Sequence, residues 1–430
     1  RQTDSAVTLD FESKQSRGSS MGSLLIVIAA VITAPASDWP QFRGPGRDGV
    51  SDAKGLSRSW PQSGPSLLWK AEGLGEGFSS VSVAGNLICT MGDIEKQCHV
   101  VGIDRQTGKV LWKTAIGRDG GNYKGPRCTP AQDNGKVYAL GQHGDLVCIN
   151  GKDGKIVWKK DLVKDFGGMA GGWNYTESPL IDGDKLICTP GGRTSTVVAL
   201  SKTNGKQLWH CPIGEAAGYS SIVISNACGV KQYVQLLSNG LAGIRALDGK
   251  LLWRYGEKDH FKSNTANIPT PIVRGDEVFA SAGYGRGAGL VKLSKTGTGI
   301  AATEVYFNKE LTNKHGGMIA LGDFVYGDAD DRGTPQCAEW STGKVAWKRA
   351  GARQGRGSAS ITAADGMLVV RYQDGWVHLV EAGGDKPYKE LAQFKIANSD
   401  TNSWAHPVVL DGNLYLREKG MLWCHDISAR

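Results

Sequence analysis

The sequence predicts an all-β protein: an eight-bladed β-propeller of four-stranded blades, closed by its N-terminal strand. The first observation is a repeated Gly-Lys-x-x-Trp motif, whose tryptophans are Trp112, Trp158, Trp209, Trp253 and Trp347. They lie about 45 residues apart, with one doubled interval, and such a period is typical of propeller blades. The second observation is that short apolar runs alternate with Gly, Asn and Asp turns, a pattern that indicates β-strands.

Three further aromatic positions complete a set of eight. Trp69 precedes the first copy of the motif, Phe394 follows the last, and Tyr306 or Phe307 fills the doubled interval. We expect these aromatic side chains to pack each blade against its neighbour, because a single blade cannot bury its own faces.

One repeat shows the order of strands within a blade. Its strands are expected at residues 178–181, 185–189, 196–200 and 207–209. The last repeat has only three strands, whereas residues 67–69 form a fourth strand with no three strands before it. We therefore expect residues 67–69 to complete the last blade, since this pairing removes an open sheet edge.

The chain is expected to have four parts. These are an upstream extension at residues 1–20, a signal peptide at 21–36, an N-terminal arm at 37–66 and the propeller at 67–430. An apolar run at 24–33, followed by Ala34-Pro35-Ala36, indicates the signal peptide and is too short to span a bilayer. The mature protein is thus expected to be exported, either periplasmic or secreted, without a transmembrane segment. Its oligomeric state is left open.

Charge and cysteine placement exclude some functions. Much of the net charge of +8 comes from lysines in equivalent turns, such as Lys109 and Lys155, and is therefore spread around the ring. This distribution argues against nucleic-acid binding. Several of the nine cysteines occupy equivalent positions in different blades, too far apart to form disulfides, so we expect small buried core residues.

The mouth of the central channel is the candidate site. The first strand of each blade lines the channel, so the segments just before these strands converge there. We call them the blade-start segments; they hold Arg127, Trp173, Glu177, His315 and Trp404. Convergent polar groups at a concave surface predict the binding of a small molecule or a protein partner. Alternatively, the polar residues only satisfy one another or hold water.

The motif resembles that of the pyrroloquinoline-quinone-like (PQQ-like) β-propeller family over residues 67–430. The opening Asp38-Trp39-Pro40-Gln41-Phe42-Arg43-Gly44-Pro45 is similar to the start of exported family members labelled polyvinyl-alcohol dehydrogenases. The family includes quinoprotein alcohol dehydrogenases, which hold the quinone and a calcium ion at the channel mouth. It also includes non-enzymatic members such as the outer-membrane-protein assembly lipoprotein. The resemblance implies a quinoprotein-alcohol-dehydrogenase-like fold.

The resemblance also implies candidate residues for calcium and for proton transfer. The enzymes bind calcium through a Glu and an Asn, to which Glu177 and Asn264 or Asn267 correspond. Where the enzymes have a catalytic Asp, this chain has His315, so the base would be His315, which can take a proton, or a carboxylate that the sequence does not identify. The adjacent cysteines of the enzymes have no counterpart here.

If the cofactor PQQ is bound, the resemblance implies two kinds of contact, each with two candidate residues. Arg127 or Arg356 would contact the carboxylates of the quinone, and Trp173 or Trp404 would stack on its rings.

Two functions from different classes remain open, and with them the question of whether the chain is an enzyme. The first is a binding or scaffold module that engages a cell-envelope protein or small ligand, favoured by the missing Asp, adjacent cysteines and haem motif. The second is a PQQ- and calcium-dependent alcohol dehydrogenase. A shared pocket for Glu177, the asparagines and a flat ligand favours the enzyme. A mouth filled by side chains or by the 37–66 arm contradicts it.

Overall fold

The computed structural model describes residues 37–429, except 263–265, 298, 331, 350–353, 398, 400 and 401. These residues belong to one compact unit, 36–430. The predicted upstream extension and signal peptide fall within residues 1–36, outside the described part. No helix in the described part is long and apolar enough to cross a membrane.

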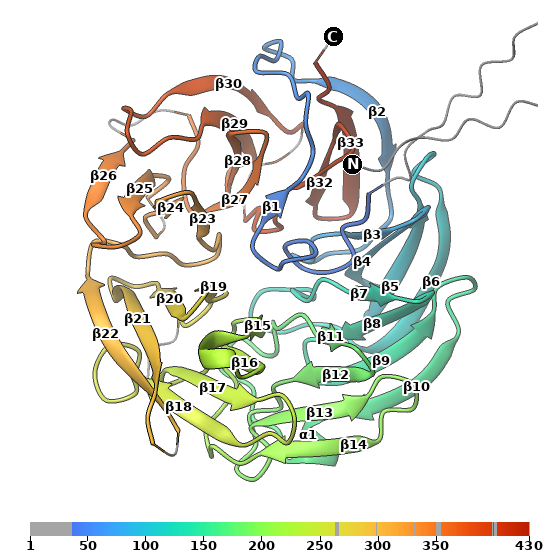
Figure 1. The fold of residues 1–430 in the computed structure, drawn as a ribbon. Helices are drawn as coiled ribbons and strands as arrows, with labels where there is room; N and C mark the ends of the chain where they lie inside the picture. Colours follow the sequence, from blue (N-terminus) through green and yellow to red (C-terminus); the bar gives the residue numbers. More distant parts are fainter. Residues whose placement is uncertain are drawn as a thin grey trace, which may run out of the picture. The chain divides into compact units, whose positions relative to one another are not determined.

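The predicted eight-bladed propeller is confirmed. Eight antiparallel sheets follow one another around a ring, and the colours in Figure 1 pass once around it along the chain. In each complete blade the strands run in sequence order from the channel to the rim. The aromatic anchors lie on the outermost strands, as the repeat predicted.

The first four blades span the N-terminal half of the propeller. The first has β3 (Ser82–Ala84), β4 (Leu87–Ile94), β5 (Gln97–Asp104) and β6 (Val110–Arg118), and the second has β7 (Ala131–Asp133), β8 (Lys136–Leu140), β9 (Asp145–Asn150) and β10 (Ile156–Asp161). The third has β11 (Leu180–Asp182), β12 (Lys185–Cys188), β13 (Val197–Ser201) and β14 (Gln207–Cys211), and the fourth has β15 (Val223–Ser225), β16 (Gln232–Leu236), β17 (Leu241–Arg245) and β18 (Leu251–Tyr255). Two short helical segments, α1 (Leu162–Phe166) and η1 (Ala227–Gly229), lie in the connections.

The last four blades complete the ring. The fifth has β19 (Ile272–Arg274), β20 (Glu277–Ala282), β21 (Gly287–Lys295) and β22 (Ile300–Asn308), and the sixth has β23 (Ile319–Leu321), β24 (Phe324–Asp328), β25 (Pro335–Glu339) and β26 (Val345–Lys348). The seventh has β27 (Ala359–Ala364), β28 (Met367–Tyr372), β29 (Trp376–Glu381) and β30 (Glu390–Lys395), and the eighth has β31 (Val408–Leu410), β32 (Asn413–Glu418) and β33 (Met421–Asp426).

The N-terminal strand closes the ring as predicted. Strand β2 (Ser66–Ala71) pairs antiparallel with β33, with Trp69 opposite Cys424, and becomes the outer strand of the eighth blade. Figure 1 shows the two strands side by side. Strand β33 therefore has no open edge in this blade, because β2 and β33 satisfy each other's backbone groups.

The anchor tryptophans pack between blades, and the structure explains the glycine of the motif. A Cβ at Gly205 would lie 3.0 Å from Cε3 of Trp158, an anchor of the preceding blade. The indole Nε1 of Trp158 donates a hydrogen bond to the carbonyl of Lys202, 2.9 Å away. In the doubled interval, Tyr306 rather than Phe307 takes this place, since a Cβ at Gly343 would lie 2.3 Å from its Cε2. Each glycine therefore makes room for the previous blade's anchor.

The N-terminal arm adds features that the repeat did not predict. Strand β1 (Val50–Ser51) pairs parallel with β27 and gives the seventh blade a fifth strand. Trp39 forms a backbone bridge with Val83 in the first blade, and Leu56 forms one with Ser428 after the eighth. The arm thus joins blades that are far apart in the sequence.

The cysteines are core residues, as expected. All nine lie in the described part of the chain and are free thiols, and all except Cys228 are buried.

Candidate functional site

A pocket lies where the blade-start segments converge. Every blade except the seventh contributes a blade-start residue to its lining. The pocket holds about 970 Å³ not filled by atoms, which includes space open to solvent. The sequence periodicity thus brings residues from distant parts of the chain to one concave surface.

One part of the lining is an aromatic group around Trp404, which we call the Trp404 cluster. The ring of Phe78 lies 4.6 Å from the indole, centroid to centroid, and the ring of Tyr123 lies 5.1 Å from it. The imidazole of His315 stacks on Trp404 at 4.3 Å, with an angle of 25° between the planes. These four side chains form a continuous aromatic surface.

A second aromatic group, the Trp173 cluster, lines the same pocket. The ring of Tyr219 lies 5.3 Å from Trp173, and the ring of Tyr284 lies 6.2 Å from it. Two aromatic clusters around one cavity suit a flat ligand, because aromatic faces stack on planar groups at little entropic cost.

The charged groups that line the pocket are basic. The guanidinium of Arg127 lies 5.7 Å from the centre of the Phe78 ring, and Nζ of Lys314 lies 4.7 Å from the centre of the Tyr284 ring. Burial lowers the pKa of Arg127 to about 10, so its side chain still carries a positive charge at neutral pH. No described carboxylate lines the pocket. The lining is therefore both aromatic and cationic.

Several polar residues at the blade starts serve the fold. The backbone N–H of Ser80 donates to Oγ1 of Thr129 (3.2 Å), that of Thr129 to Oγ of Ser178 (2.9 Å), and that of Ser178 to Oγ of Ser221 (3.0 Å). Each hydroxyl thus satisfies a buried N–H of the preceding blade. These polar residues therefore satisfy one another, which is the alternative to ligand binding that the sequence left open.

The N-terminal arm forms one side of the pocket and donates hydrogen bonds to two blades. Phe42 and Arg43 both line the pocket. Nη2 of Arg43 donates to the carbonyl of Met318 at the start of the sixth blade. Nη2 of Arg47 donates to the carbonyl of Ser178 at the start of the third, 2.7 Å away. The arm therefore connects the sixth blade to the third.

With this geometry in place, comparison with known proteins decides the family. A profile of PQQ repeats, described as outer membrane protein assembly factor BamB, matches residues 96–349, which is more than half of the chain. The chain belongs to this PQQ-repeat family.

The relatives found by sequence comparison have names that describe different functions. Tetrathionate hydrolase of Acidithiobacillus ferrooxidans is 24% identical over 244 residues, which are 56% of this chain and 41% of that protein. The outer membrane protein assembly factor BamB of Salmonella typhimurium is 30% identical over 111 residues, 24% of each chain. That of Shewanella oneidensis is 24% identical over 290 residues, 63% of this chain and 69% of the relative. The chain thus spans less than half of the first two relatives.

Solved structures agree in fold. The quinohemoprotein alcohol dehydrogenase of Comamonas testosteroni superposes with a TM-score of 0.65 at 12% identity, covering 92% of this chain and 81% of that one. BamB of Moraxella catarrhalis gives a TM-score of 0.54 at 15% identity, covering 78% of this chain and 95% of that one. At these identities the likeness extends to the fold alone.

The predicted site residues of this PQQ-repeat protein fall into two groups. Arg127, Trp173, His315 and Trp404 all line the pocket. Arg356 does not line it; this residue is exposed, and its backbone N–H donates to the Asp374 side chain over 3.0 Å.

Glu177, a predicted calcium ligand, is buried outside the pocket lining. Its Oε2 accepts from the backbone N–H of Thr189 (2.7 Å) and its Oε1 from Oγ1 of the same residue (3.1 Å). Burial raises the pKa of Glu177 to about 7. Thr176 and Ser178, on either side of it, do line the pocket. Alternate residues of an extended segment point in opposite directions, so Glu177 points away.

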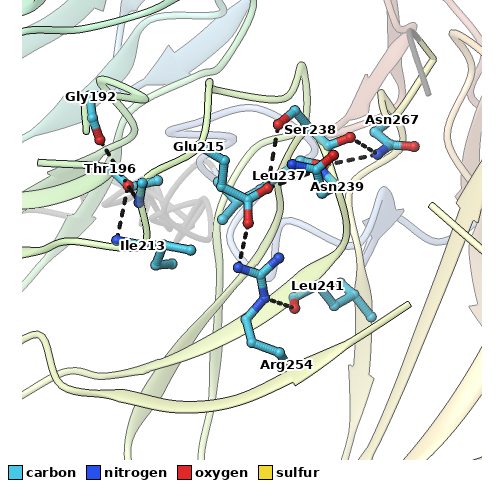
Figure 2. Close-up of polar contacts among 11 residues, drawn as sticks. Gly192, Thr196, Ile213, Glu215, Leu237, Ser238, Asn239, Leu241, Arg254 and Asn267 are labelled. Carbon is cyan, nitrogen blue, oxygen red and sulfur yellow. Dashed lines mark hydrogen bonds and ion pairs between the residues drawn. The ribbon is translucent and has the colours of Figure 1, made fainter. Parts of the chain in front are cut away.

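The predicted asparagine ligands are also absent from the described lining. Asn267 is fully buried, and its Nδ2 donates to the carbonyls of Leu237 (2.9 Å) and Ser238 (3.0 Å), as Figure 2 shows. Glu215 holds the same turn, because its Oε2 accepts from the backbone N–H of Asn239 (3.0 Å). Asn264 lies outside the described residues. The structure thus does not bring Glu177 and Asn267 together at the pocket.

The lining suits a flat anionic molecule better than a calcium ion. Aromatic faces and basic groups fit a planar molecule that carries negative charge. Calcium needs six to eight oxygen ligands, preferably carboxylates. Among the described residues, no group of three His, Cys, Asp or Glu side chains could hold a metal ion.

Sequence reasoning missed four aromatic or charged residues that line the pocket. Tyr123 lies between β6 and β7, Tyr284 lies between β20 and β21, and Phe42 and Arg43 belong to the arm. The loop tyrosines occupy no repeated position, so periodicity gave no signal for them. Phe42 and Arg43 lie in the opening motif, which was noted only for its family resemblance.

Proposed function

We propose that the chain is an exported binding propeller of the cell envelope, whose mouth pocket holds a small ligand with a flat apolar body. The observation that carries the proposal is the meeting of the Trp404 and Trp173 clusters in one pocket. Such a surface favours planar groups through stacking and desolvation. The envelope location rests on the predicted signal peptide and on relatives named for outer membrane protein assembly.

The polar groups at the pocket fit a binding role better than a catalytic one. No described carboxylate lines the pocket to act as a base, and the carboxylate of Glu177 is engaged by Thr189. Membership of this family also allows a scaffold role, in which the chain binds a cell-envelope protein. Tyr284 is 51% exposed at the pocket, where it can meet such a partner.

A PQQ-dependent alcohol dehydrogenase is the second candidate. It is favoured by the grouping of Arg127, Trp173, His315 and Trp404, the residues that the family resemblance assigned to the quinone and the base. In this candidate the quinone supplies the redox chemistry, and the chain stacks and orients it. Nδ1 of His315 lies 3.0 Å from Oγ of Ser358, an interaction that fixes the imidazole. The calcium ligands of the enzymes have no described counterpart at the pocket.

The test is a fluorescence titration with N-phenyl-1-naphthylamine, a flat uncharged probe. We expect saturable binding that Trp404→Ala weakens roughly three- to tenfold, because ring stacking contributes about 0.5–1.5 kcal/mol beyond buried area. Trp60→Ala is the matched control, since Trp60 packs on Phe394 away from the pocket. Absence of saturable binding, or an equal loss in both variants, contradicts the proposal.

A parallel titration with PQQ and calcium separates the two candidates. Dye-linked alcohol oxidation that requires both additions would favour the dehydrogenase over the binding module.

A further inference from the structure

An Arg–Glu ion pair is buried between the seventh and eighth blades. Nη2 of Arg371, near the end of β28, lies 2.9 Å from Oε2 of Glu418, at the end of β32. The two side chains are 0% and 3% exposed. A pair taken out of water in this way is often no more stabilising than apolar side chains of similar volume. Stability alone therefore does not account for the pair, and its other contacts indicate its role.

The pair holds the segment between β30 and β31, which carries Trp404. Oε2 of Glu418 accepts a hydrogen bond from Oγ of Ser403. Nη1 of Arg371 donates to the backbone carbonyl of Ala405 over 2.7 Å. The residues directly before and after Trp404 are thus bound by the two members of one ion pair.

A second serine of the segment binds the same carboxylate. Oγ of Ser399 donates to Oε2 of Glu418 over 2.8 Å and lies 3.1 Å from Oγ of Ser403. Gly375, in the turn between β28 and β29, leaves room for this hydroxyl, because a Cβ there would lie 2.1 Å from Oγ of Ser399. Hydrogen bonds to a charged group are stronger than those between neutral groups. These bonds therefore restrict where the segment can lie.

Gln373, which directly follows β28, fixes the ring of Trp404. Its backbone carbonyl accepts from the N–H of Ser403 over 2.9 Å. Its Oε1 accepts from the indole Nε1 of Trp404, also over 2.9 Å. The Trp404 cluster is built around this indole, so the position of the indole sets the shape of one side of the pocket.

Building on the proposed flat-ligand pocket, we infer that the Arg371–Glu418 pair is a clamp that positions Trp404 for stacking. Neither member of the pair lines the pocket, so the pair acts through Trp404 and not through contact with the ligand. A charged pair suits this role because its hydrogen bonds have direction, whereas apolar side chains would let the segment settle in other positions. Loss of the pair should therefore change the pocket more than it changes stability.

The test follows Trp404 directly, by fluorine NMR of protein labelled with 5-fluorotryptophan. Each of the thirteen tryptophans gives a signal, and that of Trp404 is identified by its loss in Trp404→Phe. The double variant Arg371→Met plus Glu418→Leu removes both charges together, and we expect the Trp404 signal to shift toward that of free 5-fluorotryptophan. The signal of Trp158, which packs between other blades, should stay. An unmoved Trp404 signal in the folded double variant overturns the inference.

Another Arg–Glu pair supplies the matched control. Glu215 pairs with Arg254 and accepts from Oγ of Ser238 over 3.3 Å, in the turn that Figure 2 shows. Neither member of this pair lines the pocket. Arg254→Met plus Glu215→Leu removes the same kind of pair and is expected to leave the Trp404 signal unchanged. An equal shift in this control overturns the inference, because the shift would then follow from the loss of any such pair.

Binding of N-phenyl-1-naphthylamine connects the clamp to the pocket. The double variant at Arg371 and Glu418 should bind this probe roughly three- to tenfold more weakly, the loss expected for Trp404→Ala. In a Trp404→Ala background the two replacements should cause no further loss, because they act through the indole. A further loss of the same size in that background overturns the positioning role. If the wild-type protein does not bind the probe, the proposed pocket is wrong, and the fluorine signal still decides whether the pair positions Trp404.

Circular dichroism must establish that the double variant folds. If it does not fold, Ser399→Ala plus Ser403→Ala takes its place. This change keeps both charges and removes only the two hydroxyls that donate to the carboxylate of Glu418. The Trp404 signal is again expected to shift, and an unchanged signal in this variant overturns the inference.

Discussion

Replacing Glu177 with glutamine tests whether this residue is a buried structural acid. Its carboxylate accepts two hydrogen bonds from Thr189, and Nε2 of Gln235 lies 3.5 Å from its Oε1. A glutamine can keep the bond to the Thr189 N–H through its carbonyl oxygen. Its new amide group takes the place of Oε1 and can donate to Oγ1 of Thr189, which lies 3.1 Å from that oxygen in the wild-type protein. The change therefore removes a titratable group at little cost in packing.

The expected magnitude follows from the pKa of Glu177. Burial raises this pKa from its ordinary 4.5 to about 7. The folded protein thus holds a proton that the unfolded chain has already released, and the free energy of unfolding falls as pH rises from 4.5 to 7. A pKa difference of about 2.5 corresponds to about 3 kcal/mol. Glu177→Gln cannot ionise, so its stability relative to wild type should rise by about this amount across the interval.

Urea unfolding followed by tryptophan fluorescence, from about pH 4 to about pH 8, measures this difference. The comparison must be between variant and wild type, because His406 acts in the opposite direction. Burial lowers the pKa of that histidine from 6.5 to about 3, so its contribution to stability increases as pH rises toward 6.5. Subtracting the wild-type curve removes this shared effect.

Glu72→Gln is the matched control, because the Glu72 side chain is 59% exposed beside Lys70. It should follow the wild-type pH profile. A constant difference between Glu177→Gln and wild type over the whole pH range would refute the assignment of Glu177 as a buried acid with a raised pKa.

Two further predictions concern the anchors and calcium. Trp158→Ala should lower the free energy of unfolding by about 3–5 kcal/mol, because Trp158 is buried between blades. The matched control is Val157→Ala. Val157 is 47% exposed, so this change should cost less than about 0.5 kcal/mol. In urea denaturation, a loss well under 1 kcal/mol for Trp158→Ala would contradict the inter-blade role of the motif. Calcium addition or chelation should leave the affinity for N-phenyl-1-naphthylamine unchanged, because Glu177 faces Thr189 and not the pocket; a calcium-dependent gain that Glu177→Gln abolishes would contradict this placement.

The fold could be predicted because its key contacts repeat. Five of the eight anchors meet the glycine of the next motif, as Trp158 meets Gly205, so one spacing in the sequence encodes most of the blade boundaries. The pairing of β2 with β33 could also be predicted, since each strand lacked a partner in the repeat pattern.

The site could be predicted only where it follows the repeat. The blade starts supplied Arg127 and Trp404, but the orientation of Glu177 depends on the alternation of side chains along its segment. If Thr176 and Ser178 are assigned to the channel, the alternation of side chains along the segment predicts from the sequence that Glu177 points away. Tyr284 and Arg43 reach the pocket through a loop and the arm, and their positions depend on tertiary contacts outside the repeat.

The pairing of β2 with β33 has a consequence for biosynthesis. Strand β2 leaves the ribosome before β3 to β32, whereas its partner β33 follows only after seven complete blades have been made. Until then, the edge of β2 and its exposed Leu67 and Leu68 have no sheet to join. Contacts between distant segments also slow folding. The ring can therefore close only after all eight blades have been made, and a chain that lacks the last blade needs protection from aggregation during that delay.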